Sequence, residues 1–179
     1  MKNIALMLTL ATLASCGGAK LPAVDPQTIG MPVVSEIGES FGDAIAFTWT
    51  TPEGDKGSFG PSKDYTILTF WKYGCSNCIP EVENINMASG QYKDVHFLTI
   101  CINPPDSLDS TISILQSLDL ETPIVFDPGS NLADKYSVST IPDLMLLDGD
   151  GKIIKRKKAG VTVDNLLEMI DLIPQGGGK

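Results

Sequence analysis

Runs of apolar residues divide the central part of the chain into strands and helices. Residues 65–71 are β-branched, aromatic or apolar at nearly every position, which predicts a strand buried on both faces of a sheet. Residues 95–102 have the same character and predict a second buried strand. Between them, residues 75–88 predict a helix. The order strand, helix, strand is typical of an α/β domain.

Helices and strands continue to alternate in the C-terminal half. Apolar residues recur at helical spacing at Leu108, Ile112 and Leu115. The turn at 148–151 has the sequence Asp-Gly-Asp-Gly and predicts a hairpin, because glycine adopts positive φ without steric cost. The expected elements are a helix at 106–118, a short strand at 123–126, a helix near 131–136, strands at 144–147 and 152–156, and a final helix capped by Thr162 with Val163, Leu166, Leu167 and Ile170 on one face.

The stretch before the first buried strand predicts a hairpin that follows a long lead-in. Residues 44–50 and 57–59 flank a cluster of turn residues at 51–56, as in a β-hairpin. Residues 17–40 are rich in glycine, proline and small side chains and show no sustained period. We therefore expect this lead-in to be a poorly ordered tether.

The N-terminus has the pattern of an export signal. A basic start at Lys2 precedes a mostly apolar stretch at 4–13, which is too short to cross a hydrocarbon core. The next residues, Leu13-Ala14-Ser15-Cys16-Gly17, resemble the lipobox of bacterial lipoproteins, in which the signal is removed before a cysteine that carries lipid. The resemblance implies lipidation of Cys16, whereas the alternative is a plain secretory signal with an incidental cysteine. The expected division of the chain is a lipoprotein signal peptide at 1–15, a lipidated N-terminus and flexible tether at 16–40, one α/β domain at 41–174 and a disordered tail at 175–179.

Composition and charge narrow the class of protein. With 42% hydrophobic and 20% charged residues among 179, the chain has the composition of one folded domain rather than of a disordered or fibrous protein. Its 13 basic and 22 acidic residues give a net charge of −9, which argues against nucleic acid as a partner. The dense basic run at 155–158 is expected to be a solvated strand end.

Two of the four cysteines form a C-x-x-C motif at the start of the predicted helix. Cys75 and Cys78 then lie on one side of the first turn, where their sulfurs can close a disulfide or face solvent together. Cys75 is the candidate nucleophile, because unpaired N–H groups at a helix N-terminus favour a thiolate. Attack by Cys75, a mixed disulfide and displacement by Cys78 would make a cycle of thiol–disulfide exchange.

Other roles for this pair remain open from the residues alone. A zinc site needs two more ligands, and His96 with Cys101 offers only a poor completion. A purely structural disulfide would close a very small ring, which removes little entropy from the unfolded chain. We expect Cys101 to be a small buried hydrophobic residue and His96 to lie at the surface or at a strand end.

The placement of the motif resembles that of a known family. Phe70 and Trp71 precede the C-x-x-C, Glu81 follows its second cysteine, and Thr140-Ile141-Pro142 precedes a later strand. In this order the residues resemble the thioredoxin superfamily, and more narrowly its membrane-tethered TlpA/ResA-like thiol-disulfide oxidoreductases. The resemblance covers residues 41–173 and implies a thioredoxin-like α/β fold, with a central mixed β-sheet flanked by helices, an N-terminal β-hairpin and an inserted helix-strand element.

The resemblance also implies roles for individual residues. Cys75 matches the attacking cysteine and Cys78 the resolving one, while Pro142 matches a cis-proline whose neighbour Ile141 pairs with an extended partner. Glu81 matches an acid that tunes the titration of the cysteines; the alternative is an ordinary exposed helix glutamate. The candidate substrate-binding residues are Trp71, Ser76, Asn77, Thr140 and Ile141. The chain departs from the family pattern at Thr69 in place of a buried acid, at Gly74 in place of tryptophan and at Asp143 in place of threonine.

These features together predict a thiol-disulfide oxidoreductase of the cell envelope. We expect a lipid-anchored protein that faces the periplasm or the extracellular side, needs no cofactor and reduces envelope proteins with electrons from a membrane thiol donor. Cytochrome c maturation and general envelope redox homeostasis are both compatible with this role. The alternatives are a thiol peroxidase that uses Cys75 or Cys78, a copper metallochaperone with His96 as a ligand, and a surface binding module whose disulfide is idle.

Overall fold

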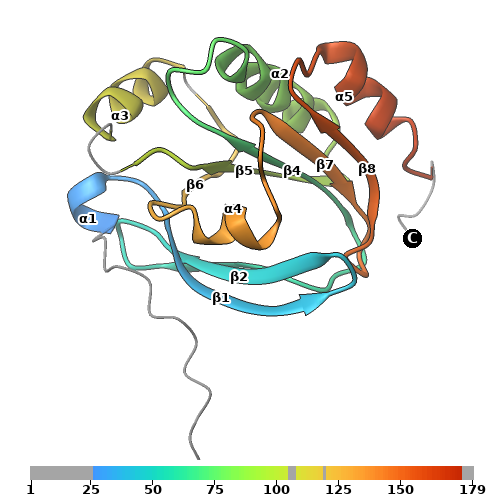
Figure 1. Ribbon diagram of the computed structural model, residues 1–179, viewed down its shortest axis with the longest axis horizontal. Helices are drawn as coiled ribbons and strands as arrows, with labels where there is room; N and C mark the ends of the chain where they lie inside the picture. The colour runs from blue at the N-terminus through green and yellow to red at the C-terminus, as the bar shows by residue number, and fades with distance from the viewer. Residues whose placement is uncertain (1–25, 105–107, 119, 175–179) are drawn as a thin grey trace, which may run out of the picture.

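The computed structural model describes residues 26–104, 108–118 and 120–174, which form one mixed sheet with helices on both faces (Figure 1). The predicted signal peptide at 1–15, Cys16 and the predicted tail at 175–179 lie outside the described residues. The elements are α1 (Pro26–Ile29), β1 (Val33–Phe41), β2 (Ala44–Thr50), β3 (Lys56–Phe59), β4 (Tyr65–Trp71), α2 (Cys78–Gln91), β5 (Val95–Cys101), α3 (Leu108–Ser117), β6 (Ile124–Phe126), α4 (Asn131–Lys135), β7 (Asp143–Leu147), β8 (Ile153–Lys158) and α5 (Val163–Ile170).

The strands follow the order β3-β2-β1-β6-β5-β4-β7-β8. Strands β1, β6, β5 and β4 run parallel, whereas β7 is antiparallel to β4, and the β7–β8 and β1–β2–β3 pairs are antiparallel hairpins. In Figure 1, α2, α3 and α5 cover one face of the central strands, and α4 lies on the other face, over β1 and β2. The mixed sheet, the early hairpin and the inserted α3–β6 element agree with the predicted fold.

Strand β4 shows why this arrangement buries a core on both faces. Leu68 and Phe70 pack on the α4 side with residues of β2, while Ile67 packs on the α2 and α5 side. All three side chains are fully buried. A strand whose two faces both meet apolar layers needs β-branched, aromatic or apolar residues at nearly every position, which is the pattern that predicted it. The buried strand delivers the chain to the sheet edge where the cysteines lie.

The predicted tether was too long. Within residues 16–40 the structure has helix α1 and most of strand β1, and Val33 and Val34 are buried in the sheet. Gly38 lies where an added Cβ would come within 3.3 Å of the Ala46 carbonyl oxygen on β2. The carbonyl of Pro32 accepts a hydrogen bond of 2.8 Å from the Phe126 amide. Glycine and proline therefore serve close strand packing here, and the folded domain begins before residue 41.

Helix α2 also starts later than predicted. It begins at Cys78, with Asn77 as its N-cap, so Cys75 lies in the loop before the helix rather than in its first turn. Pro80 occupies the third helical position, where the missing N–H costs no intrahelical bond. At the other end of the chain the predicted cap is confirmed: Thr162 Oγ1 accepts from the Asn165 amide, and Asn165 Oδ1 accepts from the Thr162 amide. Among the described helices, none has the length and apolar character needed to cross a membrane.

Tyr136 joins α4 to the early hairpin, and its removal should destabilise the fold. Its hydroxyl accepts a bond of 3.0 Å from the Ile45 amide and donates one of 3.2 Å to the Ile45 carbonyl. Tyr136→Phe leaves both backbone groups without this partner, so we expect the free energy of unfolding to fall by about 1 to 3 kcal/mol in urea titrations. The exposed Tyr73→Phe is the matched control, and equal losses in the two variants would contradict the prediction.

Candidate active site

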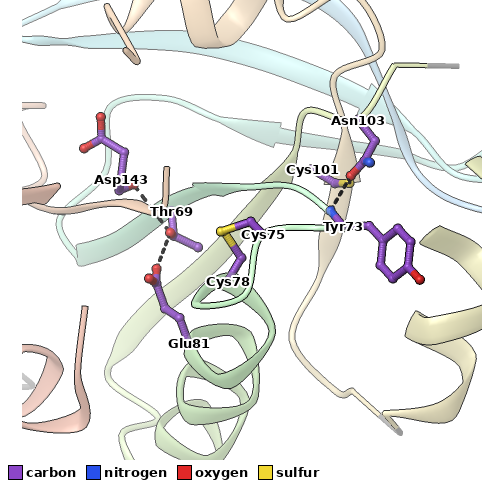
Figure 2. Close-up of a disulfide and its surroundings, with 8 residues drawn as sticks. All are labelled: Thr69, Tyr73, Cys75, Cys78, Glu81, Cys101, Asn103 and Asp143. Atoms are coloured by element: carbon purple, nitrogen blue, oxygen red, sulfur yellow. Dashed lines mark hydrogen bonds between the residues drawn. A yellow bond between two sulfur atoms is a disulfide. The ribbon is translucent and has the colours of Figure 1, made fainter. Parts of the chain in front are cut away.

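The two cysteines of the motif form a disulfide at the end of β4. The S–S bond is 2.15 Å long, the Cα atoms are 5.3 Å apart, and the Cys78 amide donates a 3.1 Å bond to the Cys75 carbonyl. Cys75 is half-buried, whereas Cys78 has no exposed surface. Cys75, in the loop before α2 (Figure 2), is therefore the residue of the pair that has exposed surface.

Gly74 sets the path of the loop before Cys75. Its φ of +85° lies in the left-handed region, which glycine adopts without strain. An added Cβ would meet nothing within 4 Å, so glycine is favoured here by backbone conformation and not by crowding. Backbone conformation thus explains why glycine replaces the tryptophan of the family pattern at Gly74.

The predicted proline loop approaches the same region. The peptide between Ile141 and Pro142 is cis. Ile141 packs against the core cluster that contains Trp71 and Cys78, and Cys75 packs against that cluster as well. Ser76, Asn77 and Thr140 are exposed around it, as a contact surface for a partner requires.

Trp71 does not belong to that exposed surface. Its side chain has no accessible area and lies in the core cluster with Cys78 and Cys101. The structure therefore gives no support to the prediction that Trp71 contacts the substrate, because the side chain has no exposed surface. Trp71 instead belongs to the buried cluster that contains Cys78 and against which Cys75 packs.

Glu81 lies one helical turn beyond Cys78 and is buried, with 2% of its surface exposed. Thr69 Oγ1 donates a 2.5 Å hydrogen bond to Glu81 Oε1 (Figure 2), while Oε2 has no partner among the described residues. Burial raises the pKa of Glu81 from 4.5 to about 7; the Thr69 bond lowers it, and the negative charge of Asp143 raises it. An ordinary exposed glutamate is excluded, and the carboxyl group can carry a proton near neutral pH.

Behind Glu81 lies an ion pair that the sequence analysis missed. Asp143 is fully buried, and both of its carboxylate oxygens accept from Arg156, at 2.8 Å from Nε and 2.6 Å from Nη2. Arg156 Nη2 also donates to the Tyr136 carbonyl at 3.0 Å. The prediction that residues 155–158 form a solvated strand end is therefore wrong for Arg156, which holds the residue that follows Pro142.

The remaining candidate residues, Cys101 and His96, are not part of the Cys75–Cys78 disulfide. Cys101 is a free, fully buried thiol, as predicted, and burial raises its pKa to about 12. His96 is exposed and pairs with Asp64 at 3.3 Å. Among the residues that the structure describes, no group of three or more histidine, cysteine or acidic side chains is arranged to hold a metal ion. The copper and zinc interpretations thus gain no support from these residues.

Three features define a thioredoxin-like protein with a redox-active cysteine pair. They are a buried strand, an accessible cysteine paired with a buried one before a helix, and a cis-proline loop. Comparison with known families agrees, since the family model described as AhpC/TSA family matches residues 42–156. The chain belongs to this family.

Individual relatives narrow the class further. The thiol-disulfide oxidoreductase ResA of Bacillus thuringiensis subsp. konkukian is 28% identical over 139 residues, which cover 77% of this chain and 79% of that protein. The ResA of Halalkalibacterium halodurans is also 28% identical, over 107 residues, and the match spans only 61% of its length and 60% of this chain. The crystal structure of StoA from Bacillus subtilis superimposes with a TM-score of 0.56 at 26% identity, covering 70% of this chain and 96% of StoA. The chain is thus a homologue of thiol-disulfide oxidoreductases and has their fold.

Proposed function

We propose that this protein is a thiol-disulfide oxidoreductase that reduces disulfides in proteins of the cell envelope. The observation that carries the proposal is the Cys75–Cys78 disulfide, in which only Cys75 has exposed surface. Ser76, between the two cysteines, and Thr140, next to Ile141 of the proline loop, are exposed, which supports a protein client rather than a small buried ligand. The ResA and StoA relatives support the same chemistry.

The proposed cycle starts from the reduced pair. The Cys75 thiolate attacks one sulfur of the client disulfide, which forms a mixed disulfide and releases the first client thiolate. Cys78 then loses its proton and attacks Cys75 Sγ, which releases the second client thiolate and restores the disulfide seen in the structure. The client gains two electrons and two protons. Two electrons from a thiol donor, which we place in the membrane, return the pair to its reduced state.

Glu81 is the proposed acceptor of the Cys78 proton. Cys78 is fully buried, so water cannot take its proton directly. Glu81 follows it by three residues, on the same side of α2, and its Oε2 has no hydrogen-bond partner among the described residues. A carboxyl group with a pKa of about 7 can accept a proton from a thiol and return it to solvent.

The first experiment is the reduction potential of the Cys75–Cys78 pair. The protein carrying Cys101→Ser is equilibrated with dithiothreitol or glutathione buffers, and the free thiols are alkylated and counted. A value near or below about −230 mV supports a reductant. A value near about −120 mV contradicts the reducing direction and makes the protein an oxidant.

Attachment to a membrane through lipidated Cys16 completes the proposal. The residues Leu13-Ala14-Ser15 before Cys16 support it, although they lie outside the described residues. We expect the wild-type protein to sediment with membranes and to take up labelled fatty acid. Cys16→Ser should abolish both properties, whereas labelling that persists in this variant would contradict the anchor.

Glu81→Gln should change how stability depends on pH. Because the folded pKa is raised from 4.5 to about 7, the native state binds more protons than the unfolded state in this window. Stability of the wild type therefore falls as the pH rises from 4.5 through 7, by about 3 kcal/mol from this group alone. Glutamine lacks the titration, so urea unfolding of the oxidised variant should lose this contribution to the slope.

The matched control is Glu83→Gln on the same helix, where the side chain is exposed. It should retain the wild-type dependence of stability on pH.

The Glu81→Gln variant should also exchange disulfides about a hundredfold more slowly than the wild type above pH 7, because the glutamine amide cannot accept the Cys78 proton. If the rate of disulfide exchange depended on pH in the same way in Glu81→Gln and in the wild type, Glu81 would have no role in the mechanism.

A further inference from the structure

The loop between β4 and α2 is held by few polar contacts. At its start, the Ile102 amide donates a 2.9 Å hydrogen bond to the Trp71 carbonyl. Beyond that point Lys72, Tyr73 and Gly74 are exposed. The backbone amide of Tyr73 donates a hydrogen bond of 2.6 Å to Oδ1 of Asn103, and this contact is drawn in Figure 2. An exposed loop is thus tied to the interior two residues before Cys75.

Asn103 itself is buried, with 2% of its surface exposed, and it follows the end of β5 by two residues. The same oxygen that accepts from Tyr73 also accepts from the Cys101 thiol, at 3.2 Å. An amide oxygen has two lone pairs, and these two donors occupy both. Cys101 has no exposed surface, so its S–H group is a fixed donor inside the core.

We propose that Asn103 is a positioning residue for thiol–disulfide exchange, and that the Cys101 thiol holds its side-chain oxygen in place. The inference rests on the proposed function, since the loop that Asn103 fixes carries the nucleophile Cys75. Cys101 then serves as a hydrogen-bond donor rather than as a third redox thiol. Its raised pKa, about 12, keeps the S–H donor protonated at neutral pH.

The contact should matter most in the reduced protein. In the oxidised state the disulfide ties Cys75 directly to the first residue of α2. Reduction removes this bond, whereas the Tyr73–Asn103 hydrogen bond and the backbone hydrogen bond from the Cys78 amide to the Cys75 carbonyl remain. Gly74 lies between Tyr73 and Cys75, and glycine gives the backbone there more conformational freedom than another residue would. The Tyr73–Asn103 hydrogen bond therefore limits the positions open to the Cys75 sulfur in the reduced protein, which is the state that attacks a client.

Hydrogen exchange at the Tyr73 amide tests the contact directly. In the reduced wild-type protein this amide should exchange slowly although the residue is exposed. Asn103→Ala and Cys101→Ala should speed the exchange at least about tenfold, because each removes a partner of the shared oxygen. Cys101→Ser should leave it unchanged, since serine keeps a donor in nearly the same place. An unprotected Tyr73 amide in the wild type would overturn the proposal.

The second measurement is the rate of exchange between the reduced protein and oxidised glutathione as a function of pH. Asn103→Ala and Cys101→Ala should react about tenfold more slowly than the wild type, because the nucleophile is less well placed. Cys101→Ser should match the wild type. Equal losses in Cys101→Ser and Cys101→Ala, or wild-type rates in all variants, would overturn the positioning role. If Asn103→Ala fails to fold, the comparison of the two Cys101 variants still decides.

These results separate the inference from the proposed function. A wild-type protein that exchanges with glutathione but reduces no protein disulfide contradicts the proposed function and leaves the Tyr73 amide result to decide the role of Asn103. Conversely, a wild type that reduces client proteins while the Tyr73 amide exchanges freely contradicts only the positioning role.

Discussion

Replacing Cys75 by serine is expected to lower the rate of disulfide exchange by at least about a thousandfold, because a serine hydroxyl is not ionised at neutral pH and cannot form a mixed disulfide. The rate is measured with a disulfide-containing peptide in the presence of dithiothreitol. Cys101→Ser is the control for loss of a thiol as such and should retain full activity. Unchanged activity after Cys75→Ser would support the surface binding module with an idle disulfide.

Cys78→Ser should give a different outcome from Cys75→Ser. Cys75 keeps its exposed position and can still attack, but the buried resolving sulfur is missing. The mixed disulfide with the client therefore accumulates and is detected as a larger species on non-reducing gels. If Cys75→Ser traps this species and Cys78→Ser does not, the assignment of the two cysteines must be exchanged.

Arg156→Leu is expected to lower the free energy of unfolding by about 3 to 5 kcal/mol, because it leaves the fully buried carboxylate of Asp143 without its partner. Two hydrogen bonds from the guanidinium group to this carboxylate are lost together. Chemical unfolding of the oxidised proteins at neutral pH measures the difference.

The double variant Asp143→Leu with Arg156→Leu provides the decisive comparison. Removing both charges eliminates the unpaired buried ion, so much of the lost stability should return. Lys158→Leu, at an exposed position on the same strand, should cost little. A double variant as unstable as Arg156→Leu alone would mean that the ion pair is not the cause of the loss.

The sequence predicted the elements that have a strong local pattern. Residues 65–71 are β-branched, aromatic or apolar at nearly every position because β4 is covered on both faces, and the glycine-rich turn at 148–151 lies between β7 and β8. The cysteine pair was recognised from its spacing and the cis-proline loop by resemblance, and the structure brings both against one core cluster. Buried periodicity and turn chemistry are local properties, so they can be recognised without the fold.

The features that were missed depend on contacts between distant segments. Strand β1 is stabilised by its neighbours β2 and β6, whereas the wider stretch at 17–40 that contains most of it has the glycine and proline content of a linker. Arg156 belongs to a run of four basic residues, and nothing in that run distinguishes the side chain that turns inward toward Asp143. Asn103 follows the end of β5, and its role appears only when the loop that carries Tyr73 is placed beside it.

The order of strands in the sheet has a consequence for the newly made chain. The β1–β3 meander can pair as soon as it is synthesised, but β4 lies between β5 and β7, and Arg156 is on the last strand, β8. Pairing between such distant segments closes long loops and is slow. Cys75 and Cys78 therefore exist for a time as ordinary thiols of an incomplete chain, before β7 and β8 complete the sheet beside β4. In an oxidising compartment the two sulfurs are exposed to wrong partners during this interval, and their proximity in sequence favours pairing with each other first.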